Sequence, residues 1–503
     1  MLKKCKITKK SSKTKEKNSD IKKLIFSKNE LNNISLDLFK LIQLMLLNKL
    51  KGKNDKIILI KKNRINWKIK KLTIIILLKN FLFYILINPI LTVKLFNKIK
   101  YLNSNQIINL KAIKGTKVKI INSKFIPNKL YINGVISNFE SSTYVNINNR
   151  EINDITLEWV EKKTNYDKIF QDINGVIEID LSKFDTSGVT SMKAMFINCQ
   201  KLVNIDLTNV NTASVTNMTS MFENCTSLIS LNLSNFDVSK VLYTDKMFKN
   251  CNSLTSLNLS NFKTPNLKKM EEMFSGCSSL QNLDISNFNT IKISNMGSLF
   301  YLCKQLTSLN IMNFNTQKVK NMNEMFKNCE SLISIDLTNM DTSIVTNMNN
   351  MFYECKSLTS LDLSHFITSK VIEMSYMFTN CTNLTFLDIS HFDTSKVVKM
   401  EYMFKNCESL LSIDLSNFEL SNQNLESFFC HCYSLTSIKF SEKKNLLLYN
   451  ISFMFKDCRS LDINEKIIKS KKGKEDVKNA KNTQALQTPQ TNKAVPNNSP
   501  NTF

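Results

Sequence analysis

The feature that most constrains this chain is a cysteine that returns at a nearly fixed interval through its C-terminal part. Each step is 26 residues long, except the step of 25 from Cys407 to Cys432. Such a period indicates one supersecondary unit copied along the chain, so we expect a stacked solenoid that acts through its surface. The eleven repeat cysteines are Cys199, Cys225, Cys251, Cys277, Cys303, Cys329, Cys355, Cys381, Cys407, Cys432 and Cys458.

The unit SLTSLDLSHFITSKVIEMSYMFTNC, which ends at Cys381, shows what each copy contains. Leu361 begins an L-x-L pair, and this alternation is typical of a strand with one buried face. Val371, Met374 and Met377 follow at steps of three, which favours one face of a short helix. Each coil is therefore predicted to hold a strand, a turn and a helical return, with the strands paired in a parallel sheet.

The repeated pattern L-x-x-L-[DN]-L-S-x-F-[DN]-T-S-x-V-x-x-M-x-x-M-F-x-x-C resembles the leucine-rich repeats of the BspA-like family. These are 26-residue-repeat surface proteins of bacteria and microbial eukaryotes, and the resemblance covers about residues 173–463. It implies an α/β right-handed leucine-rich-repeat solenoid of about eleven coils and a role in cell-surface adhesion or recognition. The pattern departs at Ile173, which stands where the cysteine column would begin, and in the unit from Asn422 to Cys432, which lacks the T-S-x-V turn.

The N-terminal part has a different composition. Residues 1–71 carry 22 Lys and Arg against 5 Asp and Glu, and we interpret them as a largely disordered basic arm with one short apolar helix. Residues 72–93 are long and apolar enough to cross a bilayer, although Lys79 weakens this prediction. Eight basic residues in the 20 before this segment against four in the 20 after it favour an uncleaved signal anchor with the repeats outside. The alternative is an ordinary buried segment.

Two further regions flank the repeats. Residues 105–172 contain short β-branched runs separated by Pro, Asn, Gly and Ser, which predicts a small β-rich module. Such a module would cap the solenoid, because its first coil would otherwise expose an apolar face and an unpaired strand edge. Residues 464–503 are polar and hold too few apolar residues to fold, so we expect a disordered tail.

The repeat cysteines are candidates for disulfides, metal binding or buried thiols. Parallel side chains in adjacent coils disfavour bridging, and no C-x-x-C or Cys/His spacing recurs. We therefore predict a ladder of free buried thiols, with some disulfides as the alternative and no metal or cofactor site.

Acidic residues form a second column, between the strand leucines. Asp336, Asp362, Asp388 and Asp414 are consecutive members, and alternation directs them to the solvent side of a concave sheet. At roughly 5 Å spacing such carboxylates repel one another, and a cationic partner or Ca²⁺ would relieve the repulsion. A stripe that only keeps the surface soluble is the simpler interpretation, and both remain open.

The sequence favours a binding protein over an enzyme. It contains no Ser/His/Asp order and no Gly-rich phosphate loop, and we expect no bound nucleic acid. His365 and His391 are 26 residues apart in a column filled elsewhere by Asn, so a polar turn role is expected for them. The preferred hypothesis is a membrane-tethered surface protein that binds a protein or glycan through the concave face. The alternative is an intracellular, cytoplasmic scaffold with a basic arm.

Overall fold

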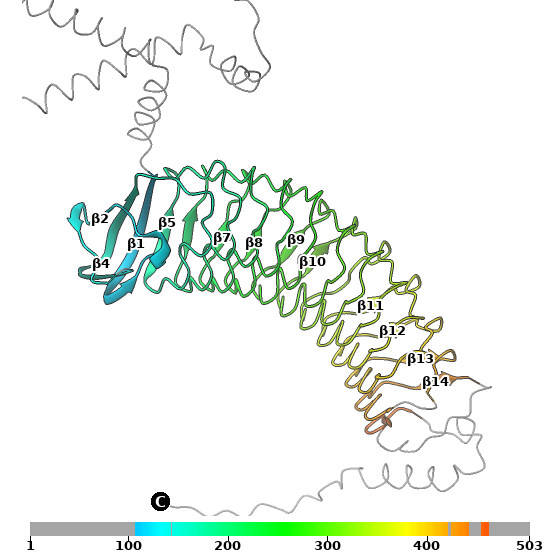
Figure 1. Ribbon diagram of the computed structural model, residues 1–503. Coiled ribbons are helices and arrows are strands. Elements are labelled where there is room, and N and C mark those ends of the chain that lie inside the picture. Colours follow the sequence, from blue (N-terminus) through cyan, green and yellow to red (C-terminus); the bar gives the residue numbers. More distant parts are fainter. Residues whose placement is uncertain (1–105, 142, 421–423, 442–453, 462–503) are drawn as a thin grey trace, which may run out of the picture. The chain divides into compact units, whose positions relative to one another are not determined.

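The computed structural model describes residues 106–141, 143–420, 424–441 and 454–461. Most of these residues form a β-solenoid of about ten turns with parallel sheets, and an antiparallel sheet precedes it (Figure 1). The arm at 1–71, the apolar segment at 72–93 and nearly all of the tail lie outside the described residues. Within the described ranges, no helix is long and apolar enough to cross a bilayer.

The first described residues form an antiparallel sheet that continues into the solenoid. Short β runs were predicted here, but the structure joins most of them into the long strands β1 (Gln106–Lys119) and β4 (Tyr144–Trp159), flanked by β2 (Lys129–Ile132) and β3 (Val135–Ser137). A single 3₁₀ turn, η1 (Ser123–Phe125), precedes β2. Strand β1 pairs antiparallel with β5 (Val176–Asp180) of the first coil, and β5 pairs parallel with β6 (Asn204–Asp206). The module thus supplies the hydrogen-bonding neighbour that the first coil would otherwise lack.

The coils then contribute short parallel strands, one above the next. Neighbouring strands lie in register with a shift of one repeat, so that Leu283 pairs with Leu309 and Leu361 with Leu387. The coil at 334–336 forms no strand, and the parallel sheet is interrupted there. The remaining strands are β7 (Ser230–Leu231), β8 (Ser256–Leu257), β9 (Asn282–Asp284), β10 (Ser308–Asn310), β11 (Ser360–Leu361), β12 (Phe386–Leu387), β13 (Ser412–Leu415) and β14 (Ser437–Phe440).

The return segment of each coil is not the helix that the Val-Met-Met spacing predicted. Between residues 143 and 420 the described chain contains no α-helix; the α/β class is therefore corrected to a β-solenoid. In the return that ends at Cys199, alternate N–H groups donate to the next coil, as from Ala194 to the carbonyl of Thr219 at 2.8 Å. The N–H groups between them donate three residues back, as from Cys199 to Phe196 at 3.2 Å.

This alternation explains why the helix does not form. An α-helix uses each interior N–H within its own segment and leaves none to join neighbouring coils. Here Ala194 and Asn198 adopt the left-handed conformation, with φ of 54° and 61°, and their equivalents do so in the following coils. These residues turn the chain every four positions. The side chains that a helix would bury are therefore still buried, while half of the backbone N–H groups donate to the next coil.

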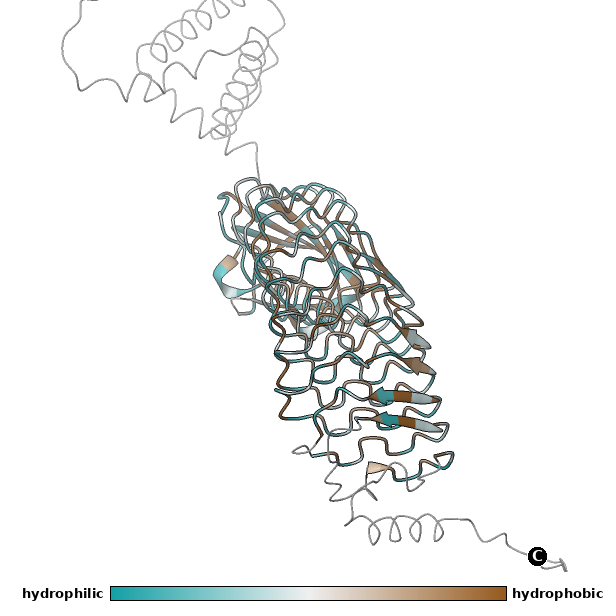
Figure 2. Ribbon diagram, turned by 90° about the vertical axis from the view of Figure 1, so that its right-hand side faces the viewer, coloured by the Kyte–Doolittle hydropathy of each residue, from teal (hydrophilic) through white to brown (hydrophobic). Residues whose placement is uncertain are grey.

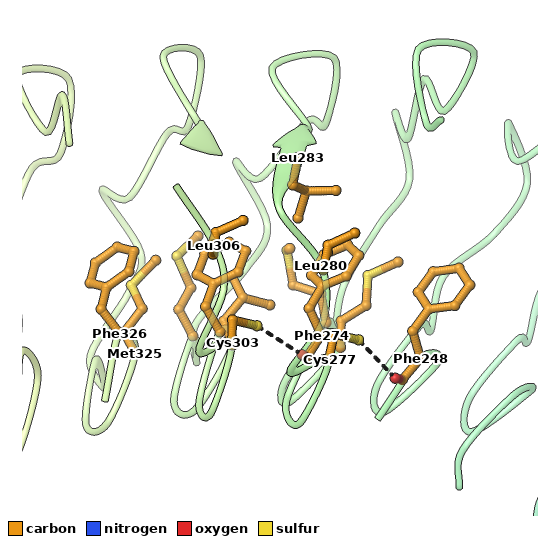
Figure 3. Close-up of a cluster of buried hydrophobic side chains, with 14 of the residues drawn as sticks. Phe248, Phe274, Cys277, Leu280, Leu283, Cys303, Leu306, Met325 and Phe326 are labelled. Atoms are coloured by element: carbon orange, nitrogen blue, oxygen red, sulfur yellow. Dashed lines mark hydrogen bonds between the residues drawn. The ribbon is translucent and has the colours of Figure 1, made fainter. Parts of the chain in front are cut away.

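The interior is built from columns of identical side chains. The phenylalanines before the repeat cysteines stack with ring centroids 5.3–5.8 Å apart, and Phe248, Phe274 and Phe326 of this column are labelled in Figure 3. The repeat cysteines and the methionines of the return segments lie beside them with almost no exposed surface. Each coil therefore buries both of its faces against its neighbours, which supplies the stability that a single coil lacks.

Candidate interaction surface

The outward side chains of the parallel strands form a continuous surface, which we call the strand face. It comprises the column of Asp336 and its equivalents, the column of Ser360 and its equivalents, and the residue that precedes each strand. The inward residues, such as Leu361, are buried. Figure 2 shows the resulting recurrence of polar and apolar residues from coil to coil.

The four predicted aspartates lie on the strand face. Asp336, Asp362 and Asp388 are exposed, and Asp414 is partly buried beside Lys439, whose ammonium lies 2.8 Å from the Asp414 carboxylate. Each carboxylate accepts a hydrogen bond from the N–H two residues later, as Asp362 does from Ser364 at 2.9 Å. The column therefore has a local structural task, an Asx turn at the end of each strand.

Asparagine performs the same task elsewhere in this column. Asn232 and Asn258 each accept from the N–H two residues later, at 3.1 and 3.0 Å. The turn requires one acceptor oxygen and no charge, so the negative charges from Asp336 to Asp414 exceed what the fold needs. No group of three or more His, Cys, Asp or Glu within the described ranges could hold a metal ion.

The stripe is ionised at neutral pH. The N–H of Thr338 lowers the pKa of Asp336, and the equivalent N–H groups of Ser364 and Ser390 lower the pKa values of Asp362 and Asp388. Partial burial opposes ionisation of Asp414, but hydrogen bonds from Lys439 and Ser416 outweigh it and lower the pKa of this carboxyl.

Four apolar side chains on the strand face are exposed among these polar columns. Ile229, Ile333, Phe386 and Leu411 retain 49%, 55%, 61% and 53% of their accessible surface. The position of Phe386 is Ser or Asn in the other coils from β6 onward. Exposed aromatic and aliphatic groups within a polar surface are typical of protein-binding sites.

His365 and His391 belong to a turn column beside this face. Asparagines there donate to carbonyls of the preceding coil, as Asn261 does to Ser234 at 3.1 Å. His365 takes the same place, with Nε2 2.6 Å from the carbonyl of Leu337. His365 is therefore the polar turn residue that the sequence predicted.

The repeat cysteines are part of the interior and not of the interaction surface. All twelve described cysteines are free and buried. Each repeat thiol donates to the carbonyl of a phenylalanine in the preceding coil, at 3.0–3.3 Å, and Figure 3 shows this contact for Cys277 and Cys303. Burial raises the pKa values of Cys277 and Cys381 to about 12, so these thiols stay protonated donors.

Two further ladders were missed in the sequence analysis. Buried threonines of the T-S-x-V turn bond to the next coil, as Thr290 does to the backbone of Asn315. Asparagines directly before the cysteines link successive side chains, as from Asn224 to Asn198 at 2.6 Å. The signal was present as recurrent Thr and Asn, but this composition is also typical of solvated turns.

Two solved structures are similar to this chain. The TLR13–ssRNA13 complex is 16% identical over 56% of this chain and 45% of that chain, with a TM-score of 0.19. A leucine-rich-repeat protein of Leptospira interrogans is 13% identical over 59% of this chain and 71% of that chain, with a TM-score of 0.22. The chain thus spans less than half the length of the TLR13 chain.

No curated protein matches this sequence. One family profile does, in overlapping segments that correspond to the solenoid and most of the polar tail. The matched segments are residues 164–283, 245–360, 332–443, 359–470 and 388–492, which together cover more than half of the chain. The protein therefore belongs to the family described as "Mycoplasma protein of unknown function, DUF285".

Proposed function

We propose that this protein is a non-catalytic cell-surface recognition or adhesion protein, of the BspA-like kind, whose strand face binds a protein or glycan. A repeat solenoid offers a long open surface, which suits a macromolecular partner better than a small molecule that must be enclosed. The narrower assignment to the BspA-like surface proteins rests on the repeat pattern given above.

The observation that carries this proposal is the exposure of Phe386 and Leu411 beside ionised aspartates. An aromatic side chain exposed to 61% in a Ser column has no role in the stacking of the coils. At a protein interface such a group becomes a buried anchor, while Asp362 and Asp388 favour a partner segment with positive charge. These side chains favour a protein partner over a glycan.

The test is a binding comparison on a panel of immobilised proteins and glycans of known structure. Phe386→Ser restores the residue of the other coils, and the quadruple change of Asp336, Asp362, Asp388 and Asp414 to Asn keeps each turn acceptor. Both variants should fold like the wild type. For any panel member that the wild type binds, the affinity of each variant should be at least tenfold lower. Ser308→Ala, in the same column but far from Phe386, is the control. Unchanged binding by both variants would refute the assignment of the strand face.

Membrane tethering is a separate part of the proposal. Its support is the length and apolarity of residues 72–93 and the excess of basic residues before them. Protease treatment of intact cells, followed by detection with an antibody to the repeats, tests it. Loss of the epitope from intact cells is expected, and its survival until permeabilisation would reject a surface location.

One observation favours the second candidate, an intracellular interaction scaffold. The twelve described cysteines are free, and free thiols are typical of reducing compartments. Their burial and raised pKa values would also protect them in an oxidising environment, so the surface function remains our preferred proposal. The protease experiment separates the two candidates.

A further inference from the structure

A basic patch lies on the turns that follow the strands of three successive coils, those that carry β8, β9 and β10 (Figure 1). The corresponding segments, 261–270, 287–296 and 313–322, contain six lysines and no Asp or Glu. All six side chains are exposed. We call them the lysine edge: Lys263, Lys268, Lys269, Lys292, Lys318 and Lys320.

The equivalent segments of the other coils are close to neutral. Segment 235–244 has one Asp and one Lys, segment 339–348 has one Asp, and segment 365–374 has one Lys and one Glu. In these segments the Asp often accepts the hydrogen bond of an Asx turn, as Asp237 and Asp341 do. Lys263, Asn289 and Asn315 replace it in the three basic coils, so the lysine edge arises from loss of acids as well as gain of lysines.

The edge lysines also differ in pairing from the lysines that follow two of the repeat cysteines. Lys304 and Lys356 both lie close to Glu330, at 3.1 and 2.9 Å. None of the six edge lysines forms an ion pair with a described carboxylate. Neighbouring coils are roughly 5 Å apart, so these charges repel one another, and an anionic surface would relieve the repulsion.

Exposed apolar side chains accompany these lysines. Ile291 precedes Lys292 at the turn and is 44% exposed, and Met312, at the start of the next coil's turn, is 51% exposed. Ile291 occupies a position that is Ser in several other coils, including Ser239 and Ser343. The phenylalanines of the edge segments are buried, so these segments display no aromatic ring on which a nucleic-acid base could stack.

We propose that the lysine edge docks the solenoid on an anionic phospholipid bilayer. Lysines near such a surface are attracted to its negative potential, and aliphatic side chains among them gain by entering the interface. A soluble polyanion would use the lysines but would gain nothing from Ile291. This contact is independent of the strand face and of any membrane span in residues 72–93.

The experiment is vesicle co-sedimentation with the full chain and, in parallel, with residues 95–503, which omit the basic arm. The vesicles are phosphatidylcholine alone or phosphatidylcholine with about 30% phosphatidylglycerol, an anionic lipid. We expect binding only to the anionic vesicles and its loss at high salt. Each edge lysine removed should weaken binding about fivefold at low salt.

Matched variants make the test specific. Lys268, Lys318 and Lys320 changed together to Gln should reduce partitioning by about 100-fold, from fivefold per lysine. Lys240, Lys370 and Lys396 changed to Gln remove the same charge outside the edge and should have a much smaller effect. Ile291→Ser should weaken vesicle binding several-fold. Circular dichroism and thermal unfolding check that all variants fold.

Three results would overturn the proposal. The first is equal loss in the two triple variants, which would indicate attraction to overall charge. The second is equal binding to vesicles with and without phosphatidylglycerol. The third is binding of heparin or single-stranded DNA in preference to vesicles, with no effect of Ile291→Ser, which would assign the edge to a soluble polyanion.

Discussion

Thr290 offers the sharpest test of how the coils are held together. Its hydroxyl donates to the carbonyl of Asn315 at 2.8 Å and accepts from the N–H of Asn315 at 2.7 Å. The side chain is 1% exposed. One hydroxyl therefore satisfies both backbone groups of a residue in the next coil, and Thr290→Val removes both hydrogen bonds while nearly conserving the volume.

The magnitude follows from these two bonds. Each hydrogen bond contributes about 1 kcal/mol net, and a backbone group left without a partner costs about 1–3 kcal/mol. Because Asn315 is partly exposed, water replaces some of this loss, and we expect Thr290→Val to cost about 2–3 kcal/mol. Thr290→Ser keeps the hydroxyl and loses one buried methyl group, at about 1 kcal/mol.

Hydrogen exchange at the Asn315 amide is the appropriate assay, because a repeat array need not unfold in one step. A local loss of about 2 kcal/mol should accelerate exchange roughly 30-fold in Thr290→Val, and much less in Thr290→Ser. The chain contains its own control at Val238, where no hydroxyl is available and the N–H of Lys263 bonds to Asn261 at 2.9 Å. Val238→Ala should therefore leave exchange at Lys263 unchanged. Equal exchange in the Val and Ser variants of Thr290 would refute the bridging role.

Three further predictions concern the thiols, a carboxylate and a glycine. Folding raises the pKa values of Cys277 and Cys381 from 9.0 to about 12, so the stability that these thiols contribute is intact below pH 9 and falls as the pH rises towards 12. Iodoacetamide at pH 8 should label these two cysteines only after denaturation, and mass spectrometry would show this. Folding lowers the pKa of Asp362 below 3.8, so its contribution is lost as the pH falls through that range, and acid unfolding of Asp362→Asn should lack this component. Gly276→Ala places Cβ 2.2 Å from Oδ1 of Asn250 at φ +77°, and it should lower stability by roughly 1–3 kcal/mol in thermal unfolding, whereas Gly188→Ala, which meets no neighbour within 4 Å, should cost less.

The period and the buried columns could be predicted from the sequence because each leaves a regular apolar signal. The return segment shows the limit of that reasoning. The spacing of Val371, Met374 and Met377 identified the buried residues correctly, yet two backbones bury the same residues. A helix and a series of turns with left-handed residues differ in where their N–H groups donate, and side-chain periodicity carries no information about this.

The candidate surface divides in the same way. Alternation around Leu361 placed Asp362 outward, but it could not show that the carboxylate closes a turn with Ser364. Nor could it distinguish buried Thr290 from exposed turn hydroxyls, because both look polar in sequence. The lysine edge was missed because overall composition sums lysines from all coils, and only the register of the repeats places six of them together without acids.

These findings separate residues that build the solenoid from residues that distinguish one coil from another. The columns of Phe, Cys, Thr and Asn link each coil to the next, so a substitution in them should first weaken the contact between neighbouring coils. The strand face and the lysine edge vary from coil to coil while the interior stays constant: Phe386 replaces Ser, Lys263 replaces Asp, and Asp replaces Asn in four consecutive turns. Stacking does not require any of these replacements. We therefore expect that these replacements are clustered on the strand face and the lysine edge because they serve binding and not folding. The variants of the strand face and of the lysine edge should accordingly change binding with little effect on the free energy of unfolding.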